Sequence, residues 1–153
     1  MKTCLALEAS TDACLVALQH EGKLYSLLDT TPRMHARRLM PMVETVLKDA
    51  GLNRRALTDL AVGMGPGSFT GIRIAVGLVQ GLALGLGLPV RPVCSLAATA
   101  WPIARQRPEQ VVAVVRDARM GEHYVGVFQW QAEKLITLLP PTLSSYDETQ
   151  NLI

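Results

Sequence analysis

The chain has 153 residues, of which 49% are hydrophobic and 18% are charged, and its formal net charge is +2. This length and apolar fraction allow a buried core in one domain, or in one domain and part of another. The low net charge disfavours direct binding of nucleic acid by this chain. Three cysteines without a CxxC pair disfavour a disulfide framework and a zinc site, and they favour a cytoplasmic location.

The first part of the chain predicts a strand, a hairpin and a helix. Residues 3–8 form a short apolar run, and residues 13–28 alternate around a Glu21-Gly22 turn. Helical spacing of apolar residues follows, and Gly51 is a natural stop for that helix. The apolar positions of this expected helix are Leu39, Met42, Val43, Val46, Leu47 and Ala50.

The middle of the chain predicts alternating strands and helices. An apolar strand over residues 59–64 leads into a Gly/Pro/Ser/Thr loop and a long glycine-rich helix, and residues 88–95 and 95–105 read as a further strand and helix. This order predicts parallel pairing in an α/β fold. The apolar run over residues 74–90 contains Gln80 and several glycines, so a buried helix and a turn are expected there and not a membrane span.

Residues 111–139 repeat the strand-turn-strand pattern of the first 28 residues. Two lobes that each begin with a β-meander resemble the actin-like ATPase, sugar kinase and Hsp70 superfamily, with a mixed sheet and helices. We place the boundary in the polar stretch after residue 105, which gives an N-terminal lobe over residues 1–105. Residues 106–153 are then the β-meander that starts a second, incomplete lobe.

The loop GMGPGSFTGIR raises the question of an anion site. It lacks the lysine and the glycine spacing of a P-loop, and it does not match GxGxxG. It predicts a strand-to-helix corner with Ser68 or Thr70 as the N-cap, whose backbone N–H groups could bind an anion. The candidate anion-binding residues are Gly65, Gly67, Ser68 and Thr70. The alternative is a tight turn and helix cap without a ligand.

The helix after this loop carries glycine at every fourth position, at Gly77, Gly81 and Gly85. Each glycine inside a helix costs roughly 0.5–1 kcal/mol relative to alanine, so close approach of another backbone is the expected compensation. That neighbour is either part of the same fold or a partner subunit.

Groups that could perform catalysis are scarce. His20, His35 and His123 are scattered without an HxxxH or HExxH pattern. The acids Glu8, Asp12 and Asp117 lie near meander turns, where actin-like ATPases hold metal and phosphate. The first such turn, EASTDAC, contains no glycine, so a phosphate could not approach its backbone closely. We therefore expect no catalytic residue, no metal and no cofactor.

Four segments, in this order and spacing, resemble the bacterial TsaB family, also called YeaZ: LALEASTDACLVAL, MHARRLMPMVETVL, GMGPGSFTGIRIAVGLVQGLAL and RDARMGEHYVGVF. The resemblance implies an actin-like fold related to TsaD, which transfers a threonylcarbamoyl group to adenosine 37 of tRNAs that read ANN codons. It also implies a catalytically inactive partner that pairs with TsaD, meets the ATPase TsaE in the complex, self-associates, and contacts tRNA only indirectly.

Two departures bear on this resemblance. Ser95 and Thr99 stand where TsaD has its HxxxH metal site, and two hydroxyls cannot replace two imidazoles as ligands of a transition metal. Glu8 stands where the first strand of the family usually ends in Asp.

The preferred hypothesis is a scaffold subunit that presents two helices to TsaD. Its expected interface residues are Leu39, Met42, Val43, Val46, Arg73, Gly77, Gly81 and Leu84. The alternatives are a nucleotide-binding regulator that uses the GPGSFTG loop and a peptidase-like hydrolase. The second lacks a zinc motif and a nucleophile–base pair.

Overall fold

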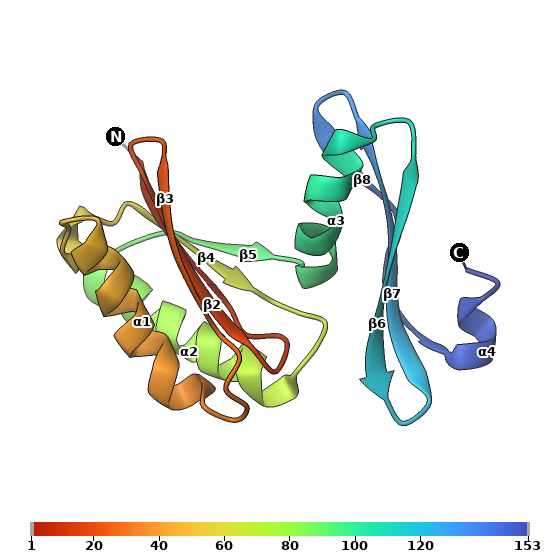
Figure 1. The fold of residues 1–153 in the computed structure, drawn as a ribbon, viewed down its shortest axis with the longest axis horizontal. Helices are drawn as coiled ribbons and strands as arrows, with labels where there is room; N and C mark the ends of the chain where they lie inside the picture. Colours follow the sequence, from red (N-terminus) through yellow and green to blue (C-terminus); the bar gives the residue numbers. More distant parts are fainter. Residues whose placement is uncertain (1, 153) are drawn as a thin grey trace. The chain divides into compact units, whose positions relative to one another are not determined.

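The fold is known from a computed structural model, which describes residues 2–152. The described chain alternates strands and helices (Figure 1). The strands are β1 (Thr3–Glu8), β2 (Cys14–His20), β3 (Lys23–Asp29), β4 (Asp59–Gly63), β5 (Val90–Val93), β6 (Val111–Arg119), β7 (Glu122–Gln131) and β8 (Lys134–Ser145). The helices are α1 (His35–Asp49), the 3-10 turn η1 (Arg54–Ala56), α2 (Phe69–Leu86), α3 (Ser95–Gln106) and α4 (Tyr146–Thr149).

The chain divides into two compact units, residues 1–93 and 94–153. The sequence analysis places the boundary after residue 105 and so assigns α3 to the N-terminal lobe. In the structure α3 belongs to the second unit. The reason is packing: Leu96 and Ala100 of α3 are fully buried in one cluster with Phe128 of β7. Nothing within the sequence of an isolated helix tells which sheet it will cover.

The first unit is a five-stranded sheet in the order β3-β2-β1-β4-β5. The strands β1 and β2 pair antiparallel, with Leu5 opposite Leu18, and β1 and β4 pair parallel, with Leu5 opposite Leu60. Because residues directly opposite each other share a face of the sheet, these leucines form one apolar surface. The predicted hairpin and the predicted parallel pairing are both confirmed.

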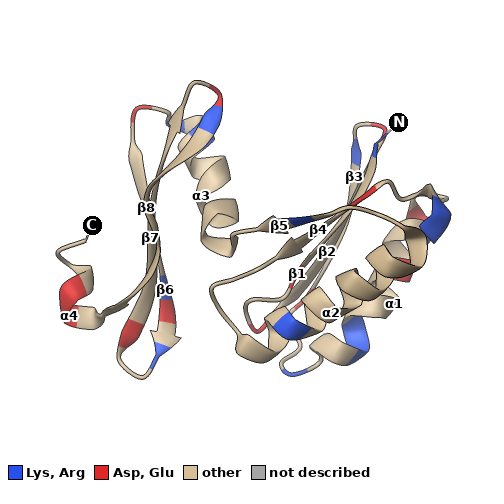
Figure 2. Cartoon of the chain, turned by 180° about the vertical axis from the view of Figure 1, so that it is seen from behind, with Lys and Arg blue, Asp and Glu red and all other residues tan. Residues whose placement is uncertain are grey.

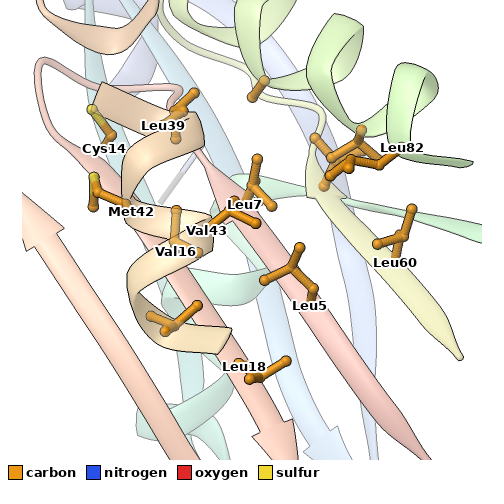
Figure 3. Close-up of a cluster of buried hydrophobic side chains, with 14 of the residues drawn as sticks. Leu5, Leu7, Cys14, Val16, Leu18, Leu39, Met42, Val43, Leu60 and Leu82 are labelled. Atoms are coloured by element: carbon orange, nitrogen blue, oxygen red, sulfur yellow. The ribbon is translucent and has the colours of Figure 1, made fainter. Parts of the chain in front are cut away.

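Helices α1 and α2 cover that apolar surface, and their inward side chains complete a single core (Figure 3). Its fully buried members include Leu5 and Leu7 of β1, Val43 of α1 and Val79 of α2. Burying a side chain of this size stabilises a fold by about 1.5–3 kcal/mol. The core therefore fixes both helices on the sheet, and it also fixes which of their faces remain exposed.

Helix α1 begins at His35 and ends at Asp49, and Gly51 follows with φ +69°. The Gly51 and Leu52 N–H groups donate to the carbonyls of Lys48 and Leu47, which satisfies two carbonyls at the helix end. The predicted glycine stop is confirmed. Pro41 lies inside the helix, and its carbonyl accepts a hydrogen bond from the Thr45 hydroxyl at 2.9 Å.

Helix α2 begins directly after the loop that leaves β4. Ser68 is its N-cap, and the Ser68 hydroxyl accepts a hydrogen bond from the Gly71 N–H at 3.2 Å. At the other end, Gly87 takes a left-handed conformation that ends the helix. By length and composition alone, α2 is apolar enough to cross a membrane, but one face of it, including Ala75 and Val79, is buried in the core of the first unit.

The second unit is an antiparallel meander in the order β6-β7-β8, with α3 packed on it. Trp101 of α3 contacts Trp130 of β7 edge to face, with ring centroids 5.7 Å apart. The chain thus contains two β-meanders, one in each unit, as the internal repeat predicts. The strand order of the first unit and the repeated meander confirm the expected mixed α/β, actin-like fold.

Candidate functional site

The loop between β4 and α2 packs against the chain's own β1–β2 turn, residues 9–13. The Ser68 N–H donates to the carbonyl of Ser10 at 2.7 Å, and the Gly71 N–H donates to the Ser68 hydroxyl. Two of the donors that an anion would require are therefore already paired with protein oxygens. The candidate anion-binding residues Gly65, Gly67, Ser68 and Thr70 lie at this corner, at the end of the loop and the start of α2.

The glycines of this loop are required by the closeness of that turn. A Cβ atom on Gly67 would overlap the Ser10 carbonyl oxygen, and one on Gly71 would overlap the Ala9 carbonyl oxygen. Gly67 also has φ +155°, and Gly65 has φ +85°, a conformation that favours glycine. Tight packing between two backbone segments thus accounts for glycines that resemble a phosphate loop in the sequence.

The β1–β2 turn is held from two further sides. The Glu8 carboxylate accepts a hydrogen bond from the Ser10 N–H at 2.5 Å. His35, which is buried at the start of α1, contacts the Thr11 carbonyl through Nε2 at 3.0 Å. Because a carbonyl oxygen can only accept, His35 Nε2 carries the proton. The hydrogen bond from the Ser10 N–H shows that the Glu8 carboxylate is directed at the backbone of the turn that follows it.

The outward face of α2 is exposed, and most of its side chains are small or apolar. Leu84 is 88% exposed and Phe69 is 70% exposed. Gly77 and Gly81 lie between them along the helix, and Gly85 follows Leu84. A Cβ atom on any of these glycines would meet no atom within 4 Å apart from its own stretch of the helix. Within the first unit, no other described segment therefore packs against these glycines. We call Phe69, Arg73, Gly77, Gly81 and Leu84 the α2 face.

Arg73 is the one charged residue of α2, and Figure 2 shows no acidic segment on this helix. The Arg73 guanidinium lies over the Phe69 ring, 3.2 Å from its centroid. Such a cation–π contact orients the guanidinium without neutralising it. Phe69 was not among the predicted interface residues. An aromatic residue four positions before an arginine at a helix start is the signal that could have identified it.

The structure separates the eight predicted interface residues into two groups. Arg73, Gly77, Gly81 and Leu84 are exposed along α2, as an interface requires. The other four lie on α1 and are at most 7% exposed: Leu39, Met42, Val43 and Val46. For these four the expectation is wrong, because their side chains fill the core between α1 and the sheet (Figure 3). The period of the pattern identifies an apolar face but does not identify the surface that covers it.

The positions compared with a metal site, Ser95 and Thr99, both lie in α3. Ser95 is buried at the first turn of α3, and the Thr99 hydroxyl donates to the Ser95 carbonyl at 2.9 Å. Across residues 2–152, no three His, Cys, Asp or Glu side chains gather closely enough to hold a metal ion.

Two of the remaining candidate residues, Asp117 and His123, both contact Tyr146. In the second unit, Asp117 accepts hydrogen bonds from the Arg119 N–H at 2.8 Å and from the Tyr146 hydroxyl at 3.3 Å. The negative charge of Asp117 raises the pKa of Tyr146. His123 stacks on Tyr146 with ring centroids 4.2 Å apart. These contacts tie α4 to β6 and β7, which is a structural role.

Comparison with known proteins gives consistent matches. The sequence profile of the TsaD family, described as tRNA N6-adenosine threonylcarbamoyltransferase, matches residues 29–152. The tRNA threonylcarbamoyladenosine biosynthesis protein TsaB of Escherichia coli is 39% identical over 145 residues, which cover 91% of this chain and 63% of that protein. TsaB of Haemophilus influenzae is 44% identical over 80% of this chain and 52% of its own length.

A solved structure of YeaZ from Pseudomonas aeruginosa superposes with a TM-score of 0.84 at 45% identity. The match covers 95% of this chain and 67% of that one. The chain thus spans about half to two thirds of the length of these relatives. The identity, the shared fold and the profile match together establish that the chain belongs to the TsaB (YeaZ) family, which is related to TsaD.

Proposed function

We propose that this chain acts as a non-catalytic subunit that binds TsaD and supports its modification of adenosine 37 in tRNAs that read ANN codons. The observation that carries the proposal is the α2 face. The relatives of this chain are named as tRNA threonylcarbamoyladenosine biosynthesis proteins, which supports a role for the chain in that pathway.

The α2 face has the properties of a helix-docking surface. It exposes two large apolar side chains, Phe69 and Leu84, at its two ends. Between them, Gly77 and Gly81 present bare backbone to open space. A partner helix can approach such a backbone closely and cover both apolar ends at once, which removes apolar area from water. Burial by a partner also compensates for the low helix propensity of the glycines.

The positive charge on the α2 face restricts which partner surface can bind there. Arg73 introduces a positive charge beside an apolar surface that contains no acid within α2. A partner helix that buries the face must therefore supply a carboxylate or a carbonyl oxygen near Arg73, since an unpaired buried charge is costly. On α1, Pro41 and Glu44 are exposed and could extend the contact, in place of the four buried residues.

Two further parts of the proposal follow from the family. The same face can bind a second copy of this chain when TsaD is absent, TsaE meets the assembly of this chain with TsaD, and tRNA is contacted through TsaD. The chain then acts in the cytoplasm, where tRNA is modified.

The nucleotide-binding alternative stays a prediction. The pairing of the Ser68 and Gly71 N–H groups with protein oxygens favours a structural role for the loop. Calorimetric titration of the protein with ATP, alone and with TsaD, tests this alternative, and heat that saturates at one nucleotide per chain would support it.

The proposed function is tested by reconstitution. Purified TsaD and TsaE are incubated with tRNA and a threonylcarbamoyl donor, with and without this chain, and modified adenosine is measured by mass spectrometry. We expect modification only when TsaD and this chain are both present, and none from this chain alone. Equal modification in its absence would contradict the proposal.

A further inference from the structure

The β1–β2 turn, residues 9–13, contacts the N-terminal ends of two helices, α1 and α2. Ser10, which is 2% exposed, accepts the hydrogen bond of the Ser68 N–H immediately before α2. The next carbonyl along the turn, that of Thr11, accepts from His35 at the first residue of α1. The turn therefore lies between the N-termini of both helices.

The contact on the α2 side leaves little room for movement. Gly67 and Gly71 have no side chain, and a single added carbon on either would overlap a carbonyl oxygen of the turn. A close-packed contact of this kind transmits a displacement of the turn to the start of α2. Phe69 and Arg73, which belong to the α2 face, lie within the first two turns of that helix.

His35 is the side chain through which α1 contacts the same turn. It is 7% exposed and donates from Nε2 to a carbonyl on a turn whose residues Thr11 and Asp12 are exposed. A buried N–H group without an acceptor is costly, so this hydrogen bond holds the turn at a defined distance from α1.

We propose that His35 is a positioning residue for the α2 face: by holding the β1–β2 turn against Gly67 and Gly71, it fixes the N-terminal turn of α2 and thereby the orientation of Phe69 and Arg73. The last step, from the orientation of these side chains to the binding of TsaD, rests on the function proposed above.

The coupling is tested in the isolated protein by hydrogen exchange of single amides. His35→Leu keeps a buried side chain of similar size but removes the donor, and we expect the Ser68 and Gly71 amides to exchange about tenfold faster. His35→Gln retains an N–H donor and is expected to restore slow exchange. Thr45→Ala is the matched control on the same helix, because the Thr45 hydroxyl donates to the Pro41 carbonyl within α1.

Unchanged exchange at Ser68 in folded His35→Leu protein would overturn the proposal, and so would failure of His35→Gln to restore it. If His35→Leu does not fold, native-state exchange of the unaltered protein in low concentrations of urea decides the question. The Ala13 amide, which donates to the Thr11 hydroxyl, and the Ser68 amide must then open in one event. Separate openings would overturn the proposal.

The partner step is measured separately. Affinity for TsaD should fall in His35→Leu and in Leu84→Ala, whereas only His35→Leu should change exchange at Ser68. If Leu84→Ala bound TsaD normally, the proposed docking function would be contradicted. The exchange measurement in the isolated protein would still test the positioning role of His35 independently.

Discussion

Asp29 shows how one side chain joins a strand to a helix. It ends β3, where its carboxylate accepts a hydrogen bond from the Thr31 N–H at 2.8 Å and forms an ion pair with Arg38 of α1. Hydrogen bonds from Thr31 and Arg38 lower the pKa of Asp29 from 3.8 to about 2. The ionised carboxylate is therefore favoured by the folded state.

The sign of the resulting pH dependence follows from linkage. Because the pKa is lower in the folded state, Asp29 stabilises the fold above its unfolded pKa, and this stabilisation is lost as pH falls from about 4 to about 2. We expect Asp29→Asn to be less stable than the unaltered protein at pH 6 and to approach it near pH 2. Urea unfolding followed by circular dichroism measures the difference, and a gap that stays constant with pH would refute this account of Asp29.

Helix α2 carries two sets of glycines that serve opposite purposes. Gly71 faces inward, where the Ala9 carbonyl leaves no room for a side chain, and Gly77 and Gly81 face outward into open space. The sequence shows the same residue type in the same expected helix for all of them. Only the tertiary fold distinguishes a glycine required within the chain from one available to a partner.

The two sets predict opposite effects of the same substitution. Gly71→Ala should destabilise the protein by about 1–3 kcal/mol, because the added carbon overlaps the turn. Gly77→Ala should stabilise it by about 0.5–1 kcal/mol, because alanine is the better helix former and meets no atom. Thermal unfolding of the two variants side by side measures the signs. Two changes of the same sign would contradict the assignment of the glycines.

Across the molecule, the features that depend on residues adjacent in sequence could be predicted from the sequence. The Glu21-Gly22 turn, the Gly51 stop and the Ser68 cap were predictable because each depends on neighbouring residues. The order of strands and the repeated meander were predictable because the alternation of strands and helices restricts the topology.

Contacts between segments that are far apart in the sequence could not be predicted from the sequence. The apolar period of α1 could not show that Leu39 and Val43 face the sheet and not a partner. The loop glycines could not show that Ser10, far away in sequence, occupies the space beside them. The same limit applies to α3: the sequence groups it with the first lobe, whereas its Leu96 and Ala100 pack with Phe128 of the second unit.

We propose that TsaD binds the exposed α2 face. Isothermal titration of TsaD with Gly81→Phe tests it, because phenylalanine would fill the open space that a partner backbone needs while meeting no atom of this chain near Cβ. Ala98→Phe, on the exposed side of α3, is the matched control. We expect Gly81→Phe to weaken binding by at least about tenfold, or ~1.4 kcal/mol, and Ala98→Phe to bind like the unaltered protein. Unchanged affinity for Gly81→Phe would contradict the claim.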